Sequence, residues 1–374
     1  MGELSSSFEY GLNVAAKEYD GENKYIRITD IDDESREFKQ EDITSPDTDL
    51  SSAENYKLSE GDILFARTGA SVGKSYIYKA SDGLVYYAGF LIRARIKPEY
   101  NSEFVFQNTL TGNYEKFIKV TSMRSGQPGV NAQEYSQYQI MMPSKPEQDK
   151  ISDCLRNLDN LITLHQRKYS KLLNVKKSML EKMFPKNGSN IPEIRFKGFT
   201  DPWEQRKLGD IADIVGGGTP STSNEEYWNG EIDWYAPAEI TNQIYVDSSE
   251  RKITEQGFNN SSAKMLPIGT VLFTSRAGIG KMAILRKESC TNQGFQSIVP
   301  HKNELDSYFI FSRSEELKRY GETVGAGSTF VEVSGKQMCA MELMMPQTID
   351  EQRKIGSYFS NLDNLITLHQ RLYF

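Results

Sequence analysis

Ten consecutive residues occur twice in this chain. Residues 158–167 and 362–371 both read LDNLITLHQR, and the two copies lie 204 positions apart. An identical decapeptide does not arise by chance in 374 residues. The chain is therefore a tandem of two similar halves, and such a protein is expected to act on a target of two parts.

The repeat continues upstream of the decapeptide, but it weakens. Residues 141–143 (MMP) match residues 344–346, and further upstream residues 61–65 (GDILF) only resemble residues 269–273 (GTVLF). The segments around the decapeptides are thus more alike than the bodies of the halves. This pattern predicts two similar scaffolds that carry different binding surfaces.

Length and composition set the outer limits of the fold. A chain of 374 residues is expected to form two or more domains, each with its own core. No apolar run approaches the ~18 residues of a membrane span, and the N-terminal residues lack the basic, then apolar, then small-residue pattern of a signal peptide. Three widely spaced cysteines provide neither a disulfide framework nor a CxxC metal site. We expect a protein of the reducing cytoplasm that has no membrane partner.

The acidic charge of the chain is concentrated in one stretch. Residues 30–62 hold twelve acidic and three basic side chains, a net of −9, so the rest of the −7 chain carries +2. An acidic protein is not an obvious partner of nucleic acid. The uneven distribution nevertheless permits a DNA-binding face away from residues 30–62.

Short β-like runs separated by glycine, serine and asparagine clusters fill residues 1–143 and again residues 188–345. We interpret these two segments as α+β domains with irregular sheets. The expected strands are 25–28, 63–66, 75–78 and 90–96 in the first domain, and 271–274, 282–285 and 298–299 in the second.

Each domain is followed by a helical segment, residues 144–187 and residues 346–374. Ser144 and Thr348 each precede a glutamate by three residues, the spacing of a capping box. Apolar residues then recur with heptad spacing, which favours a seam between two helices, an antiparallel coiled-coil spacer of roughly 57 Å. The alternative is that each helix packs on its own domain. The expected seam consists of Ile151, Leu155, Leu158, Ile162, His165 and Tyr169 in the first helix, and Ile355, Phe359, Leu362, Ile366, His369 and Tyr373 in the second.

Two variable domains that are each followed by a nearly identical helix resemble the specificity (S) subunit of type I restriction-modification systems. Besides the decapeptides, the resemblance is carried by residues 203–209 (WEQRKLG), 216–221 (GGGTPS), 227–230 (YWNG) and 272–281 (LFTSRAGIGK). The stretch 171–184 has no counterpart after Phe374, so the second spacer helix is expected to be shorter than the first.

The resemblance implies a non-catalytic DNA-recognition subunit. Each domain would be a target recognition domain that reads one half of a bipartite, asymmetric sequence in double-stranded DNA. The helices would set the spacing and dock two modification (methyltransferase) subunits, and restriction (nuclease/translocase) subunits would complete a site-specific endonuclease and adenine-DNA methyltransferase.

A glycine-rich loop at residues 67–75 superficially resembles a phosphate-binding P-loop. Its glycines have the wrong spacing, and a β-like run follows where a P-loop has a helix. We interpret it as a loop with exposed Arg67 and Lys74 that contacts the DNA backbone, the alternative being a hairpin turn with solvated bases. The candidates for this contact are Arg67, Thr68 and Lys74, with Ser275, Arg276 and Lys281 as their counterparts in the second half.

Three further polar loops carry side chains that suit base recognition, because arginine pairs with guanine and glutamine or asparagine with adenine. Ordinary surface loops are the alternative, and Trp228 would then only cap the core. The candidates are Arg124, Ser125, Gln127 and Asn131 in the first half, Thr219, Ser221, Thr222 and Trp228 in the second, and Ser328 and Thr329 before the second helix.

Motifs for catalysis, metal binding or a cofactor are absent from the sequence. There is no methyltransferase motif and no GxGxxG after a strand, and His165 and His369 are equivalent seam positions for which we expect a register role rather than a metal. Three other functions remain as rivals: a stand-alone DNA-binding regulator, a nuclease or NTPase, and a structural adaptor with no sequence preference.

Overall fold

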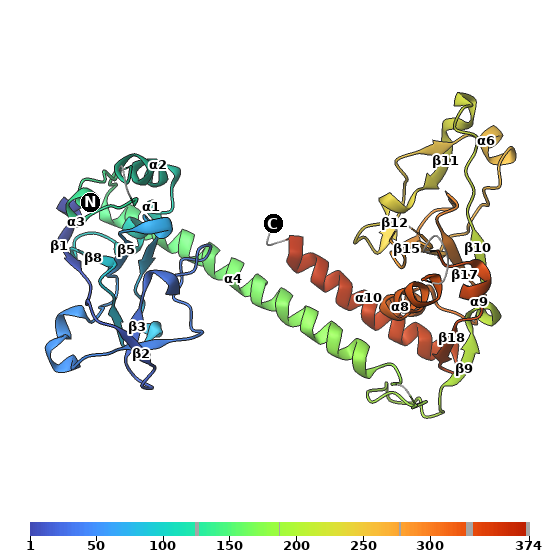
Figure 1. The fold of residues 1–374 in the computed structure, drawn as a ribbon, viewed down its shortest axis with the longest axis horizontal. Coiled ribbons are helices and arrows are strands. Elements are labelled where there is room, and N and C mark those ends of the chain that lie inside the picture. Colours follow the sequence, from blue (N-terminus) through green and yellow to red (C-terminus); the bar gives the residue numbers. More distant parts are fainter. Residues whose placement is uncertain (124–126, 187, 277, 327–331, 372–374) are drawn as a thin grey trace. The chain divides into compact units, whose positions relative to one another are not determined.

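The computed structural model describes residues 1–123, 127–186, 188–276, 278–326 and 332–371. The chain divides into two units, Met1–Leu161 and Ile162–Phe374, each with its own sheet and helices (Figure 1). The boundary lies inside the long helix α4 (Lys145–Lys182). The predicted α+β fold class is confirmed in both units.

A four-stranded antiparallel sheet in the order β1-β8-β5-β6 forms the centre of the first unit. The central strand β5 is buried along its whole length, because Ile63 and Phe65 belong to one apolar cluster and Leu64 and Ala66 to another. Such a strand is a continuous apolar run in the sequence. The four strands are β1 (Ser5–Tyr10), β5 (Ile63–Ala66), β6 (Ser75–Ile77) and β8 (Leu91–Ile96).

Three short helices cover one face of this sheet. The side chains of Asn101, Thr111 and Asn131 accept hydrogen bonds from backbone N–H groups in the first turns and so cap the three helices. Buried residues of all three helices join the cluster that contains Phe65. The helices are α1 (Ser102–Asn108), α2 (Gly112–Thr121) and α3 (Ala132–Ser136).

Small strand pairs and single helical turns complete the first unit. The pairs are β2 (Ala16–Glu18) with β4 (Thr44–Pro46), which is antiparallel, and β3 (Lys24–Ile26) with β7 (Val85–Tyr87), which is parallel. The 3-10 turns are Gly2–Leu4, Ile28–Asp30, Leu50–Ser52, Glu54–Tyr56, Gly69–Ser71 and Ala80–Asp82.

The second unit repeats the sheet of the first and extends it. Its strand order is β10-β17-β14-β15-β12, so the first four strands follow the same order as β1-β8-β5-β6. The added strand β12 pairs with β15 in parallel. The strands are β10 (Ala212–Gly216), β12 (Tyr245–Val246), β14 (Val271–Phe273), β15 (Met282–Leu285) and β17 (Gln296–Pro300).

A second, smaller sheet is built around the long strand β11 (Trp228–Tyr235). It pairs with β13 (Lys252–Ile253) in antiparallel and with β16 (Cys290–Thr291) in parallel orientation. Trp228 and Trp234 from β11 form a separate apolar cluster with Ile253 and Cys290. Helix α6 (Glu255–Asn259) and the 3-10 turns Glu225–Tyr227 and Pro237–Glu239 lie in the same part of the chain.

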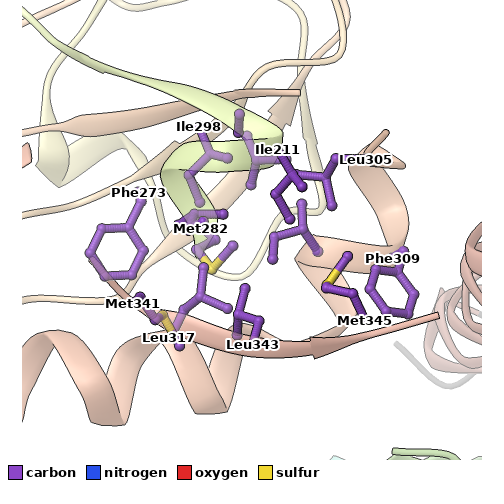
Figure 2. Packing of buried hydrophobic residues seen from close by; sticks show 14 of the residues in the cluster. Ile211, Phe273, Met282, Ile298, Leu305, Phe309, Leu317, Met341, Leu343 and Met345 are labelled. Atoms are coloured by element: carbon purple, nitrogen blue, oxygen red, sulfur yellow. The ribbon is translucent and has the colours of Figure 1, made fainter. Parts of the chain in front are cut away.

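The largest core of the second unit combines the sheet, its helices and the first half of α10 (Ile349–Arg371). Figure 2 shows side chains from β14, β17, β18 and the covering helices gathered into this cluster. The remaining elements are α5 (Leu208–Ile211), α7 (Ser307–Ser312), α8 (Ser314–Gly325), α9 (Gly335–Cys339), and β9 (Glu204–Lys207) paired with β18 (Glu342–Met345).

The two long helices pair as predicted. α4 is 38 residues long, and its C-terminal part lies antiparallel to α10, since His165 contacts His369 while Lys176 contacts Asp363 (Figure 1). The antiparallel spacer predicted from the heptads is therefore confirmed for this part of α4.

The residues of the predicted seam are buried on α10 but half-buried or exposed on α4. Leu158 and Ile162 are 50% and 43% exposed. His165, which follows both residues in α4, lies against His369 near the end of the described part of α10. On α10 the buried seam residues are Ile355, Phe359, Leu362, Ile366 and His369, and on α4 the half-buried ones are Ile151, Leu155, His165 and Tyr169. Tyr373 lies outside the described residues.

The first half of α10 also packs on its own domain, which was the alternative to the coiled coil. Ile355 and Phe359 belong to the same cluster as Trp203 and Phe309. Phe184, at the end of the α4 segment, stacks on Phe359 with ring centroids 6.0 Å apart. The heptad pattern on α10 thus serves both a helix pair and a domain core.

Candidate nucleic-acid interface

Two loops that are far apart in the sequence form one rim of the first domain. The N–H of Val130 donates to the carbonyl oxygen of Arg67 at 2.9 Å, and Thr68 pairs with Gly129 in an isolated β-bridge. The candidates that this arrangement brings together are Arg67, Thr68, Gln127 and Asn131. The two other candidates of this loop, Arg124 and Ser125, lie outside the described residues.

The guanidinium of Arg67 contacts two aromatic rings at this rim. Its guanidinium carbon lies 5.2 Å from the centre of the Tyr10 ring and 5.6 Å from that of Phe90, distances at which a cation is attracted to a ring face. Tyr10 and Phe90 are 43% and 55% exposed. The Nε of Arg67 is buried and has no hydrogen-bond partner among the described residues. The cluster of these three side chains is called the Tyr-Arg-Phe stack below.

Sequence reasoning identified Arg67 but missed Tyr10 and Phe90. Phe90 is the first residue of the predicted strand 90–96, where a core position is the usual expectation, and Tyr10 lies in a segment for which no strand was predicted. The sheet pairing brings them together, because Tyr10 pairs with Ile92 in the strand that directly follows Phe90. An exposed aromatic residue at a strand end would have been the only local signal.

The prediction that Lys74 is exposed is wrong. Its side chain is 8% exposed, and its Nζ donates to the carbonyl oxygen of Ile31 at 3.1 Å and lies 2.6 Å from a carboxylate oxygen of Asp33. This hydrogen bond lowers the pKa of Asp33. The charge of Lys74 is therefore paired with that of Asp33 in the same domain, and Lys74 is not placed to contact a phosphate.

Asn131 and Gln127 differ in how much of their hydrogen-bonding capacity remains. The side-chain oxygen of Asn131 accepts from the N–H of Glu134 at 2.9 Å and so caps α3. Gln127 is exposed. Of these two amides, Gln127 is the one whose side chain is better placed to meet a base.

The polar loop of the second domain is held by its own hydroxyl groups. The Oγ atoms of Ser221 and Ser223 lie 2.8 Å apart, the Oγ1 of Thr219 is hydrogen-bonded to the side-chain oxygen of Gln293, and Thr222 is exposed. The loop therefore presents small hydroxyl side chains without a charged group of its own.

Trp228 is a core residue, which was the alternative to base contact. It is 8% exposed, lies edge-on to Trp234 with ring centroids 5.1 Å apart, and donates its Nε1–H to the carbonyl oxygen of Ser221 at 3.2 Å. The guanidinium of Arg251 covers its ring at 3.9 Å. These contacts leave no open ring face for a base.

The second-half counterparts of the glycine-rich loop have three different environments. Ser275 is fully buried, and its Oγ has no hydrogen-bond partner in the described part of the chain. Arg276 is half-buried, and its backbone forms an isolated β-bridge with that of Glu332. Lys281 is exposed. Ser328 and Thr329 lie outside the described residues.

In both domains, the glycine that directly follows the first strand of the sheet lies very close to another backbone segment. A Cβ atom on Gly11 would lie 2.2 Å from the carbonyl oxygen of Ala88, and one on Gly217 would lie 2.0 Å from that of Asn292. Only glycine fits either position. The loops of the two halves are therefore built on equivalent backbones.

Several acids of the region 30–62 have structural partners within the first domain. Asp62 is buried and accepts a hydrogen bond from Arg95 at 3.1 Å, while Asp30 accepts from Arg27 at 2.8 Å. The N–H of Ser35 donates to Asp32 and lowers the pKa of that carboxyl group. These three acids stabilise local structure.

The histidine, cysteine and acidic side chains in the described part of the chain form no metal site. No group of three or more histidine, cysteine and acidic side chains among those residues could hold a metal ion. The Nδ1 atoms of His165 and His369 lie 2.9 Å apart. Burial, with the charges of Lys168 and His165, lowers the pKa of His369.

Within the described residues, no helix is both long and apolar enough to cross a membrane.

Two α+β domains on one chain, each with polar loops at the edge of an equivalent sheet and each followed by a long helix, define a two-site recognition protein. The model of the family "Type I restriction modification DNA specificity domain" matches residues 11–174 and again residues 200–373. The chain belongs to this family.

Individual relatives carry the same description. The MjaIX specificity subunit of Methanocaldococcus jannaschii is 38% identical over 167 residues, which cover 44% of this chain and 38% of that protein. The putative MjaX specificity subunit of the same organism is 24% identical and covers 90% of this chain and 77% of the relative. The EcoR124I/EcoR124II specificity subunit of Escherichia coli is 29% identical and covers 62% of this chain and 58% of the relative. The chain thus spans less than two thirds of the first and third of these relatives.

Solved structures share the fold over the whole chain. The S subunit of a type I restriction-modification system from M. genitalium has a TM-score of 0.58 at 12% identity and covers 98% of this chain and 92% of its own. The HsdS subunit of Thermoanaerobacter tengcongensis has a TM-score of 0.50 at 17% identity and covers 100% of this chain and 90% of its own.

Proposed function

We propose that this chain is the DNA specificity subunit of a type I restriction-modification complex, in which each domain reads one half of a bipartite, asymmetric target in double-stranded DNA. One observation carries the proposal. The two domains share the order of their strands, the positions of their loops and a glycine after the first strand, yet they present different side chains at equivalent loops. Equal scaffolds with unequal surfaces suit a target whose halves differ.

The functional modules follow the division predicted from the sequence. Residues 1–143 and 188–345 are the two recognition domains, and residues 144–187 and 346–374 are the spacer helices. The candidate contacts fall into two kinds. Exposed Lys281 suits the DNA backbone, while Arg67, Gln127 and the hydroxyl groups of Thr219 and Ser221 suit base edges.

Two modification subunits dock on the helices in this proposal. Leu161 and Leu164 on α4 are 51% and 59% exposed, and their equivalents in the repeated decapeptide, Leu365 and Leu368 on α10, are 44% and 53% exposed. Exposed leucine pairs commonly mark a binding surface. Because the same pair occurs on both helices, one kind of partner can bind twice.

Catalysis belongs to the partners. The chain supplies recognition without a cofactor, the modification subunits transfer the methyl group, and the restriction subunits cleave DNA. A chain that binds DNA in such a complex belongs in the cytoplasm.

A domain exchange tests the proposal. Residues 1–143 are replaced by the first domain of another family member, and the methylated motif is mapped in cells that carry the modification subunits. We expect one half of the motif to change and the other to persist. A change in both halves would contradict separate reading. Sequence-specific DNA binding by the purified chain alone, with no association with modification subunits, would favour a stand-alone regulator.

A further inference from the structure

The Tyr-Arg-Phe stack has the features of a preformed contact for a base. The planar guanidinium of Arg67 lies over the rings of Tyr10 and Phe90, and these contacts restrict its orientation before any ligand arrives. The rings themselves are exposed at the rim rather than packed into the core. An arrangement of this kind provides a fixed fork of N–H donors at the domain surface.

The side chain of Arg67 has an unsatisfied hydrogen-bond donor among the described residues. Its Nε is buried without a partner, although buried polar groups in native structures are nearly always satisfied. Other arginines of this domain contrast with it: Arg95 donates to Asp62 and Arg27 donates to Asp30. A stacked guanidinium without an acidic partner is free to pair with an acceptor on a ligand.

The neighbouring groups indicate which acceptor this is. Gln127, an exposed amide, lies on the adjacent loop, which is joined to Arg67 through the bond from Val130. Arginine is the common partner of the O6 and N7 acceptors of guanine, which lie in the major groove. An isolated phosphate contact would not need two aromatic rings to fix the plane of the guanidinium.

The second domain lacks this stack at the equivalent backbone positions. The N–H of Ser275 donates to the carbonyl oxygen of Gly294 at 2.8 Å, as that of Arg67 donates to Phe90 at 3.1 Å. Gly216 ends β10 as Tyr10 ends β1. The list of counterparts is therefore Gly216, Ser275 and Gly294 in place of Tyr10, Arg67 and Phe90. The stack belongs to one half of the chain only.

We propose that Arg67, oriented by the rings of Tyr10 and Phe90, reads a guanine in the half-site that the first domain recognises, and that the second domain has no equivalent reader. The inference rests on the proposed function, because it specifies how one domain of a specificity subunit discriminates bases. It changes the predicted role of Arg67 from a backbone contact to a base contact.

The test uses the full chain assembled with its modification subunits, and DNA duplexes selected by the wild-type assembly together with scrambled duplexes. Arg67→Lys retains the charge and loses the planar fork. We expect it to weaken binding to the selected duplex by about 5- to 150-fold, the value of one bidentate base contact. Binding to scrambled DNA and the salt dependence should be unchanged, and preference should relax at one position of one half-site.

Matched variants distinguish a loss of base recognition from a loss of folding. Tyr10→Ala and Phe90→Ala should relax the same position, whereas Tyr10→Phe, which keeps the ring, should not. Arg286→Lys is the control, because Arg286 also covers a ring, that of Tyr245 at 4.1 Å, but lies in the second domain near Asp247. It should leave this position unchanged. Melting temperatures identify any variant that fails to fold.

Three outcomes decide the matter. Relaxed preference at one position supports the inference. An equal loss on selected and scrambled duplexes would make Arg67 a backbone contact, and unchanged binding of Arg67→Lys would make the stack structural, with the proposed function intact in both cases. A wild-type assembly without any sequence preference would overturn the proposed function itself, and the inference with it.

Discussion

The two copies of LDNLITLHQR have identical sequences and different surroundings. Leu158 is 50% exposed and its counterpart Leu362 is 6% exposed, while Ile162 is 43% exposed and Ile366 is 8% exposed. All four lie in α-helix. The comparison separates what a local sequence specifies, which is the helix and its apolar face, from what packs against that face.

The neighbours of the second copy explain the difference. Asp363 is buried, and it accepts hydrogen bonds from Lys176 of α4 and from the hydroxyl of Tyr308 in α7. Its counterpart Asp159 is exposed and accepts from Gln107. The second copy therefore lies between a helix and a domain core, and the first copy does not.

The largest expected effect comes from truncating the equivalent leucines. Leu362→Ala should lower the free energy of unfolding by about 2–5 kcal/mol, as for other buried leucines. Leu158→Ala should change it by no more than about 0.5 kcal/mol, as for surface positions. Denaturant unfolding of the free chain measures both, and equal losses would contradict the difference in burial.

The equivalent aspartates should show the next largest difference. Asp363→Asn removes a charged acceptor from Lys176 and Tyr308, and hydrogen bonds to charged groups contribute about 1.5–3 kcal/mol. Asp159→Asn should be nearly neutral. Lys176→Met tests the origin of the effect: if Asp363→Asn is as costly in that background as in the wild type, the ion pair is not its cause.

The equivalent histidines should make the helix pair sensitive to pH. The folded-state pKa of His369 lies below its ordinary value of about 6.5. The unfolded chain therefore binds more protons in this window, and stability decreases as the pH falls through about 6.5 and below. We expect the melting temperature to fall over that range and His369→Gln to reduce the slope. A slope that survives this substitution would assign the pH dependence to other groups.

The exposed leucines should have the smallest effect on stability and the clearest effect on assembly. Serine at Leu161 and Leu164, or at Leu365 and Leu368, should change the free energy of unfolding by only about 0.5 kcal/mol. Each double variant should bind one modification subunit fewer, which native mass spectrometry measures. Loss of both partners from either variant would mean that the two surfaces are not independent.

Much of the architecture was predictable because it depends on local patterns. The strands 63–66 and 282–285 were expected and are present as β5 and β15, and the helix expected after Ser144 is α4. Short helices such as α1 and α7 were missed, since their few turns contain too little periodicity to distinguish them from loops. The strand β11 was not predicted, and its first residue, Trp228, was assigned to a polar loop.

The candidate site was less predictable, because it depends on contacts between distant segments. Lys74 was expected to be exposed, but residues 31–33 fold over it and provide its partners. Trp228 was predicted as a candidate base contact, but its ring packs against Trp234 and Arg251. Tyr10 and Phe90 acquired their proposed role only when the sheet brought both rings close to the guanidinium of Arg67.

The sequence by itself determined that the chain is a tandem, that each half is an α+β domain followed by a helix, and which family it belongs to, because repeats, heptads and motifs are properties of neighbouring residues. The tertiary structure decided which copy of an identical decapeptide is buried and which exposed aromatic rings contact Arg67. Burial and stacking depend on atoms contributed by segments far away in the chain, and no local pattern contains them.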